Sequence, residues 1–178
     1  MHLYMILMGC KPEGRKIEQH DIFFSIGNNY MDFKDEIFAA WPEAKGKIHI
    51  DAYRKVNTVG NYQVRVATRE GASPNNNGLH LYFLNLGGYK SNVLDEYHFR
   101  ELIVAKDLAD AKQQAKETVF AKNHIAYHVD DKYGIDVDDA YEVSDLLAAG
   151  VKEKYVLEII PTAQAEEDTV INGFFKLF

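Results

Sequence analysis

The sequence predicts an α+β protein built from two tandem β-β-α-β-β repeats. Three observations lead to this prediction: the two halves of the chain share residues at a constant spacing, short apolar runs end at glycines, and a helical stripe follows the second run in each half. We expect mainly antiparallel sheets with helices on one face and a pseudo-twofold relation between the repeats. The expected boundaries are 1–70 for the first repeat, 71–79 for a linker, 80–160 for the second repeat and 161–178 for a C-terminal tail.

A shift of 78 residues aligns the two halves of the chain. Self-similarity at a fixed spacing is the sequence signature of a duplication. Identity elsewhere is low, which indicates an old duplication, so the residues that both copies kept are informative. The aligned residues are His2-Leu3-Tyr4 with His80-Leu81-Tyr82, Gly9 with Gly87, Glu18 with Glu96, His20 with His98 and, after one extra residue, His49-Ile50-Asp51 with His128-Val129-Asp130.

Each half contains four predicted strands. The first strand is a buried apolar run closed by glycine, and the second places mostly apolar residues at every other position, as in a strand with one buried face. A third strand follows the predicted helix, and a fourth closes each half. The expected strands span 2–9, 20–27, 47–53 and 62–68 in the first half, and 80–88, 98–106, 125–131 and 155–160 in the second half.

One helix is predicted between the second and third strands of each half. Asn29 and Asp107 are the expected N-caps. An aspartate follows three residues after each of them, where a carboxylate can accept hydrogen bonds from the free N–H groups of the first turn. Pro42 ends the first helix, because proline cannot continue a helical hydrogen-bond ladder. The apolar stripes are Tyr30, Phe33, Ile37 and Trp41 in the first helix, and Leu108, Ala111, Ala115 and Val119 in the second.

Two segments fall outside the repeated pattern. The acidic stretch 137–150 has an apolar spacing and a terminal Gly150 that predict a short third helix. The end of the chain, 170–178, is apolar and must dock on something, because so large an apolar surface is rarely left in water. We expect it to add an edge strand to its own domain or to form the contact of a homodimer.

Composition excludes several classes of function. The chain has 178 residues and a formal net charge of −7, and it lacks the clustered Lys and Arg that bind nucleic acid. No apolar run reaches the roughly 20 residues that cross a bilayer. Its single cysteine, Cys10, excludes an internal disulfide. Residues 6–10 end like a lipoprotein signal, but no Lys or Arg precedes them. We therefore interpret them as a buried strand that ends in a Gly turn, and we expect a cytoplasmic protein.

Several motifs together resemble a known protein family. The stretch NLGGYKSNVLDEYHFRELIVAKDLADAKQQA is similar to the second copy of this family, and RKIEQHDIFFSIG and GKIHIDAY are similar to its first copy. The family is the uncharacterised bacterial domain-of-unknown-function family 1543. The resemblance runs from about residue 3 to residue 160 and implies a duplicated fold, whereas the family name implies no activity. The first copy has Cys10 where the second has Gly88, which argues against a thiol function common to both copies.

A pair of a histidine and a carboxylate recurs in both halves of the chain. Glu18 and His20 are two residues apart, and side chains two apart in a strand point to the same face. His49 and Asp51 share a face in the same way. We expect these two pairs to lie close together across adjacent strands. The equivalent set in the second half is Glu96, His98, His128 and Asp130.

Three interpretations of these sets follow from their chemistry. A histidine and a carboxylate can satisfy each other's hydrogen bonds in a buried setting without any ligand. A carboxylate can also orient an imidazole for ligand binding or acid–base chemistry. Two histidines with two carboxylates could instead hold Zn²⁺, Mn²⁺ or Fe²⁺.

The sequence shows no recognisable nucleophile setting and no phosphate-binding or dinucleotide fingerprint. The function that we expect is therefore a non-enzymatic module that binds a small molecule or a protein. The alternative is a metal-assisted or acid–base enzyme that uses the repeated Glu-x-His and His-x-Asp residues. The sequence names no cofactor. The expected partners are a small-molecule ligand and, through the tail, a second copy of the chain, with no membrane and no nucleic acid.

Overall fold

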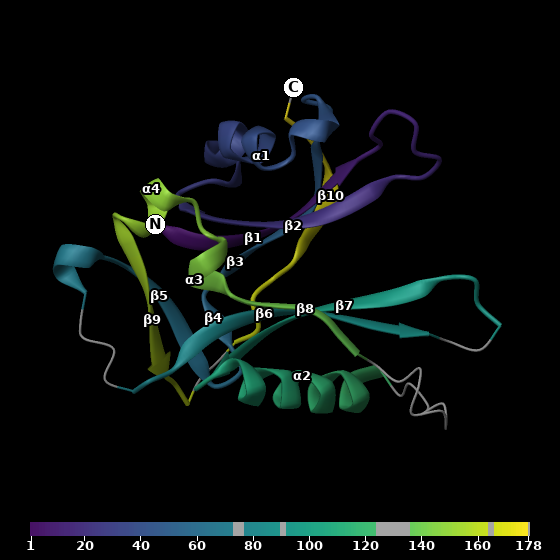
Figure 1. The fold of residues 1–178 in the computed structure, drawn as a ribbon. Coiled ribbons are helices and arrows are strands. Elements are labelled where there is room, and N and C mark those ends of the chain that lie inside the picture. The colour runs from purple at the N-terminus through teal and green to yellow at the C-terminus, as the bar shows by residue number, and fades with distance from the viewer. Residues whose placement is uncertain (73–76, 90–91, 124–135, 164–165, 178) are drawn as a thin grey trace. The chain divides into compact units, whose positions relative to one another are not determined.

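The computed structural model of the chain contains two compact units. Unit 1 comprises Met1–Ser73 with Leu146–Phe178, and unit 2 comprises Pro74–Asp145. No helix in the described part of the chain is long and apolar enough to cross a bilayer. The structure describes residues 1–72, 77–89, 92–123, 136–163 and 166–177 (Figure 1).

Unit 1 is built on a four-stranded antiparallel sheet in the order β10-β3-β1-β2. Seven of the nine residues of β1 are buried, as expected for a central strand covered on both faces. The C-terminal tail supplies β10, which pairs with β3 and so extends the sheet at its edge. The strands are β1 (His2–Cys10), β2 (Gln19–Gly27), β3 (His49–Val56) and β10 (Ile171–Lys176).

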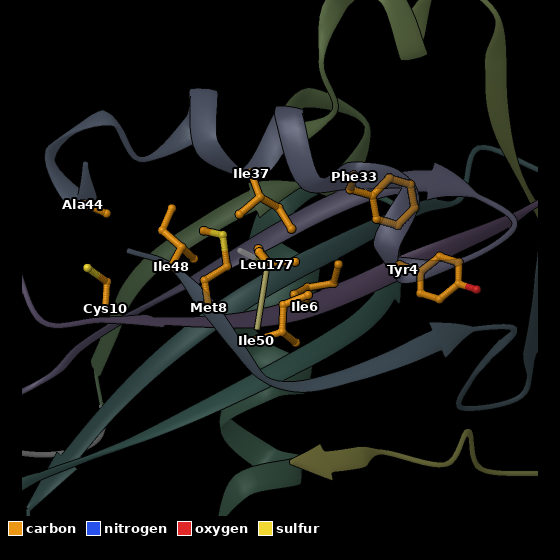
Figure 2. Packing of buried hydrophobic residues seen from close by; sticks show 10 residues of the cluster. All are labelled: Tyr4, Ile6, Met8, Cys10, Phe33, Ile37, Ala44, Ile48, Ile50 and Leu177. Carbon is orange, nitrogen blue, oxygen red and sulfur yellow. The ribbon is translucent and has the colours of Figure 1, made fainter. Parts of the chain in front are cut away.

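Short helices cover one face of this sheet and close a hydrophobic core (Figure 2). Asn29 caps the first of them: its side chain accepts from the Met31 N–H, while the Asp32 carboxylate accepts from the Asn29 N–H. The predicted N-cap is thus confirmed as a full capping box. The helices are η1 (Tyr30–Phe33), α1 (Lys34–Ala40) and η2 (Pro42–Ala44). The core cluster comprises Tyr4, Ile6, Met8, Cys10, Phe33, Ile37, Ala44, Ile48, Ile50 and Leu177.

A three-stranded sheet in the order β4-β5-β9 completes unit 1. β5 and β9 pair along their whole length, from Tyr62 opposite Pro161 to Thr68 opposite Tyr155. The sequence predicted that each strand closes its own half of the chain, whereas the two strands pair with each other. Local patterns do not encode this pairing, because strand partners are selected by packing across the fold. The elements are β4 (Thr58–Val59), β5 (Tyr62–Thr68), η3 (Arg69–Gly71) and β9 (Tyr155–Pro161).

Unit 2 has an antiparallel sheet in the order β7-β6-β8, with α2 along one face (Figure 1). Asp107 caps α2 as predicted, by accepting a hydrogen bond from the Asp110 N–H. The helix expected over 137–150 is wrong in its first half, because residues 137–142 belong to strand β8. The second half forms two short helices, α3 and α4. Pairing with β6 satisfies the backbone groups of this acidic stretch and outweighs its weak strand propensity. The elements are β6 (His80–Tyr89), β7 (Glu96–Ala105), α2 (Leu108–Asn123), β8 (Asp136–Glu142), α3 (Val143–Leu146) and α4 (Ala149–Lys152).

The two main sheets share one strand register. Gly9 of β1 lies opposite His20 of β2, and Gly87 of β6 lies opposite His98 of β7. Both residues of the second pair stand 78 residues after their counterparts, and the same spacing holds along both strand pairs. This agreement is what a duplication would produce, and the duplication itself stays a prediction. The strand expected over 125–131 lies outside the described residues.

The docking of the tail leads to a prediction about stability. Leu177 is 1% exposed and belongs to the core cluster, so Leu177→Ala should lower the free energy of unfolding by about 2–5 kcal/mol. Val170 precedes β10 and is half-exposed, so the control Val170→Ala should change it by about 0.5 kcal/mol or less. Urea unfolding followed by circular dichroism measures both variants. Equally small losses in the two variants would show that the tail does not pack on this sheet.

Candidate functional site

The candidate site forms over Gly9, in the middle of the main sheet of unit 1. Gly9 lies opposite His20 of β2 on one side and opposite His49 of β3 on the other. Strands two apart in a sheet are about 10 Å from each other, so short-range contact across a central strand needs a position without a side chain. A Cβ atom on Gly9 would lie 2.5 Å from Nε2 of His49 and closer still to Oδ2 of Asp51. The absence of that atom leaves the space in which the site forms.

This geometry corrects two details of the prediction from sequence. Gly9 does not form a turn, because β1 continues to Cys10. The strands that carry the two predicted pairs are not adjacent, because β1 lies between β2 and β3. Glu18 stands just before β2, so its side chain reaches the site from a loop. The site therefore combines a loop, two flanking strands and the gap between them.

A bulge in β3 positions Asp51. Its neighbours Ile50 and Ala52 pair with Met8 and Leu7 of β1, so Asp51 itself has no partner in that strand. A bulge adds one residue to one strand of a pair, bends that strand and re-aims a side chain. Here the extra residue brings a carboxylate over the gap in β1.

Four side chains converge over this gap. Nε2 of His49 lies 3.0 Å from Oε1 of Glu18 and 3.2 Å from Oδ1 of Asp51. Nε2 of His20 lies 3.2 Å from Oδ2 of Asp51 and 3.7 Å from Oε2 of Glu18. Each carboxylate thus places one oxygen near each imidazole, and the four groups close a ring. The structure therefore brings together all four residues that the sequence singled out in the first half.

Two atoms at the centre of this ring make no hydrogen bond with any described residue. Nε2 of His49 and Oδ2 of Asp51 are buried and have no hydrogen-bond partner among the described residues. Carboxylate oxygens lie near enough to His49, so the mismatch is one of direction rather than of distance. A buried polar atom without a partner costs about 1–3 kcal/mol and calls for a specific explanation. A bound ion that receives both lone pairs is one such explanation.

The site is covered on one side and open on the other. The His49 side chain is 9% exposed, and its ring packs on that of Phe174 with centroids 4.2 Å apart. Glu18 and His20 are 41% and 38% exposed, so they form the accessible side. A small molecule could therefore reach the ring of donors without any rearrangement of β1 or β3.

The equivalent set in unit 2 is described only in part. Nε2 of His98 lies 3.7 Å from Oε2 of Glu96, which is the same pair of atoms at the same distance as in the first half. Both side chains are about one-third exposed. His128 and Asp130 lie outside the described residues, so their contact with this pair stays a prediction.

Other groups near the site have different partners. Nδ1 of His2 lies 3.1 Å from Oδ1 of Asn57 and does not join the ring. Cys10 is buried, and this burial raises the pKa of its thiol, with the nearby Glu18 carboxylate adding to the rise. A thiol with a raised pKa stays protonated at neutral pH, which makes it a poor nucleophile and a poor metal ligand.

Two parts of the site differ from what the sequence predicts or do not follow from it. The sequence pattern aligns Gly9 with Gly87 but predicts a turn there. Its signal was present, because a glycine inside a buried strand marks a place where other groups approach closely. Phe174 could not be found, because nothing near it in the sequence indicates that the tail pairs with β3 beside His49.

A separate cavity of about 1040 Å³ in unit 1 lies near the other end of β3. Its lining includes Lys55 and the stacked rings of Tyr30 and Tyr53, whose centroids are 4.3 Å apart. Asp168 also lines it, but this carboxylate already accepts hydrogen bonds from two backbone N–H groups. No histidine is among the described residues that line the cavity. We therefore place the candidate chemistry over Gly9 rather than in this cavity.

Comparison with known proteins connects this part of the chain to a family without an assigned function. Residues 15–66 match the family described as Domain of Unknown Function (DUF1543). The matched segment carries all four residues of the ring: Glu18, His20, His49 and Asp51. Of the two copies expected from the resemblance, the match covers the first. No curated protein matches the chain.

A solved structure with a similar fold matches over nearly the whole chain. It is the crystal structure of a protein Il1583 from Idiomarina loihiensis. The match covers 99% of this chain and 97% of the Il1583 chain, with a TM-score of 0.65. The two sequences are 21% identical. The likeness therefore concerns the fold alone and transfers no role to any residue.

Gly9→Ala tests whether the gap in β1 holds the site together. The added Cβ would overlap the ring of donors, so His49 and Asp51 should move apart and the protein should lose about 1–3 kcal/mol of stability. Gly150→Ala is the matched control, because nothing lies within 4 Å of its added Cβ and its helix should gain about 0.5–1 kcal/mol. Thermal unfolding and the ¹⁵N chemical shifts of the histidine rings measure both effects. Unchanged histidine shifts in Gly9→Ala would contradict this geometry.

Proposed function

We propose that the protein binds a divalent transition-metal ion through Glu18, His20, His49 and Asp51. The observation that carries the proposal is the pair of buried atoms, Nε2 of His49 and Oδ2 of Asp51, that make no hydrogen bond with the residues that the structure describes. Ionisable groups lie only 3.0 Å and 3.2 Å from these atoms. Around a metal ion, donor atoms touch one another without hydrogen bonding, because their lone pairs all point at the ion. This arrangement supports a coordination shell better than a hydrogen-bonded cluster.

The distances between the donor atoms suit one small cation. Bonds of about 2.0–2.2 Å from Zn²⁺ to nitrogen and oxygen place neighbouring ligands about 3.4 Å apart in a tetrahedron. The contacts in the ring run from 3.0 Å to 3.7 Å, with one oxygen of each carboxylate near each imidazole. One donor atom from each of Glu18, His20 and Asp51 lies within 4.8 Å of the others. His49 lies outside this group of three; it approaches both carboxylates from the buried side, where its Nε2 would be the fourth ligand.

The chemistry of the donors selects the kind of ion. Two ionised carboxylates balance the charge of a divalent cation. Two imidazoles favour Zn²⁺, Fe²⁺ or Mn²⁺ over Ca²⁺ and Mg²⁺, which prefer oxygen ligands. A hydrogen-bonded cluster without metal would need imidazole N–H groups that point at the carboxylates, and Nε2 of His49 makes no such hydrogen bond with the described residues.

Metal-assisted catalysis is the second candidate function, and the exposure of two ligands favours it over a purely structural metal. Structural zinc sites are closed by protein ligands, whereas catalytic sites keep a position open to solvent or substrate. Glu18 and His20 are 41% and 38% exposed, so a small molecule could reach the ion and be polarised by it. The same opening would serve a non-enzymatic module that binds a small anion. A visible spectrum of the Co²⁺-loaded protein that changes when an anion is added would show the open position.

His49→Ala tests the proposal. After removal of metal with a chelator, this variant should take up one equivalent of Zn²⁺ fewer than the wild type, because it lacks the buried ligand. His2→Ala is the matched control, since His2 contacts Asn57 and should leave zinc binding unchanged. Isothermal titration calorimetry and elemental analysis of the dialysed protein measure the uptake.

The same variants separate a metal site from a structural cluster. Zn²⁺ at a hundred times its dissociation constant should stabilise the wild type by about 2.7 kcal/mol, and His49→Ala should lose this gain. A purely structural role would appear instead as a loss of about 1–3 kcal/mol in the metal-free His49→Ala protein, with no response to zinc in the wild type. Equal zinc binding by the wild type and His49→Ala would show that the proposal is wrong.

A further inference from the structure

The cavity at the other end of β3 is separate from the ring of donors over Gly9. Lys55 lies directly opposite Tyr4, so both side chains are on the face of the sheet that carries the core cluster. Side chains alternate along a strand, and Gly9 stands an odd number of positions from Tyr4, on the opposite face. Tyr4 lies at the end of the core cluster, with its hydroxyl pointing away from the other members (Figure 2). It also lines the cavity, which therefore begins where the core ends.

The start of β10 explains why this part of the sheet is open. The paired part of β10 begins at Ile171, opposite Tyr53, and Lys55 lies two positions beyond this pair. The chain before β10 is held beside the sheet by Asp168, whose carboxylate accepts hydrogen bonds of 2.7 Å and 2.9 Å from the two backbone N–H groups that follow β3. Residues 166–169 therefore form a wall of the cavity that is fixed in the absence of a ligand.

Charged side chains of both signs line the cavity without pairing with each other. Lys55 comes from β3, whereas Glu166 and Glu167 come from the wall before β10. No ion pair joins this ammonium group to either carboxylate in the part of the chain that the structure describes. Instead, Nζ of Lys55 lies 6.0 Å from the centre of the Tyr4 ring, as in a cation–π contact. All three charged side chains are exposed, so a ligand can reach them.

Aromatic rings supply the apolar part of the lining. Tyr30 and Tyr53 stack with centroids 4.3 Å apart, and Phe175 packs against both rings from the side of the core. These contacts hold the two tyrosines in place without a ligand. Burial raises the pKa of the Tyr53 phenol, so this group stays neutral at neutral pH. The cavity thus combines a fixed aromatic surface with one cation and two anions.

We propose that this cavity binds a free α-amino acid with an apolar side chain. Such a molecule carries a carboxylate and an ammonium group on the same carbon atom, which complements a cavity with a cation on one wall and anions on another. Lys55 would bind the carboxylate, and Glu166 and Glu167 would bind the ammonium group. The apolar side chain would lie against the rings of Tyr30 and Tyr53.

The charges in the cavity distinguish this ligand from other small molecules. An anion without an amine would be repelled by two carboxylates, and a cation without a carboxylate would be repelled by Lys55. A neutral ligand with many hydroxyl groups would bind through hydrogen bonds, and the lysine charge would not determine its affinity. The volume of about 1040 Å³ is close to the upper end of small-molecule pockets, about 300–1,000 Å³, so it has room for an amino acid with a large side chain.

Three forms of one ligand test the proposal. L-phenylalanine has both charges, L-phenylalaninamide lacks the carboxylate, and N-acetyl-L-phenylalanine lacks the ammonium group. Isothermal titration calorimetry of the full chain should show that L-phenylalanine and L-leucine bind. The amide and the acetylated form should bind about tenfold more weakly than L-phenylalanine, because each loses hydrogen bonds between charged groups.

Variants of the lining assign each charge of the ligand to a residue. Lys55→Met should bind L-phenylalanine and its amide equally, because the partner of the carboxylate is gone. Glu166→Gln,Glu167→Gln should in the same way lose the preference for the free ammonium group. Lys34→Met is the matched control, since Nζ of Lys34 also lies over an aromatic ring, that of Phe38, but outside the cavity lining. It should keep both preferences, and circular dichroism checks that each variant is folded.

Each other outcome would overturn the proposal. If neither L-phenylalanine nor L-leucine binds at its solubility limit, the cavity is not an amino-acid site. Equal affinity of the wild type for all three forms would show that the rings alone bind the ligand, and binding of D-glucose as tight as that of L-phenylalanine would indicate a site for hydroxyl groups. Binding that is unchanged in the variants at 55, 166 and 167 would place the ligand elsewhere. None of these results bears on the proposed metal site, which zinc uptake by the wild type and His49→Ala tests separately.

Discussion

The missing side chain at Gly9 is the constraint on which the candidate site depends. Residues directly opposite one another on antiparallel strands share a face, so Gly9 forms one row with His20 and His49 across three strands. Any larger residue in the centre of this row would hold the two imidazoles apart. With glycine there, they approach common partners, and the bulge at Asp51 and the loop residue Glu18 bring carboxylates from two directions.

Stability and binding are coupled at this place. Buried polar atoms without a partner in the described part of the chain destabilise the fold at this site, and the core cluster on the opposite face of the sheet offsets that cost. The tail contributes both to the core and to the site, because Leu177 belongs to the core and Phe174 packs on the His49 ring. A cation that pairs the buried atoms would remove the cost and so stabilise unit 1, which is the linkage expected when a ligand binds only the folded state.

Local sequence signals predict the helices and strands of this fold better than they predict which strands pair. The cap at Asn29 and the strand around His20 follow from neighbouring residues, and the structure shows both. Pairing of β5 with β9 and of β10 with β3 joins segments far apart in the chain, where packing rather than propensity selects the partner. The donors of unit 1 could be predicted because the Glu-x-His and His-x-Asp sequences occur in both halves of the chain. The gap at Gly9 and the bulge at Asp51 were not, since a bulge has no clear local signature. The apolar spacing and Gly150 predict a helix over 137–150, whereas the first part of this acidic stretch is β8, although Asp and Glu are depleted in strands.

An anomalous difference map from crystals of the Zn²⁺-loaded protein would test the central claim most directly. We expect one strong peak over Gly9, about 2.0–2.2 Å from Nε2 of His49 and from carboxylate oxygens of Glu18 and Asp51, with His20 on the accessible side. A map without a peak at this position, in which Nε2 of His49 donates a hydrogen bond to a carboxylate or a water molecule, would contradict the metal site.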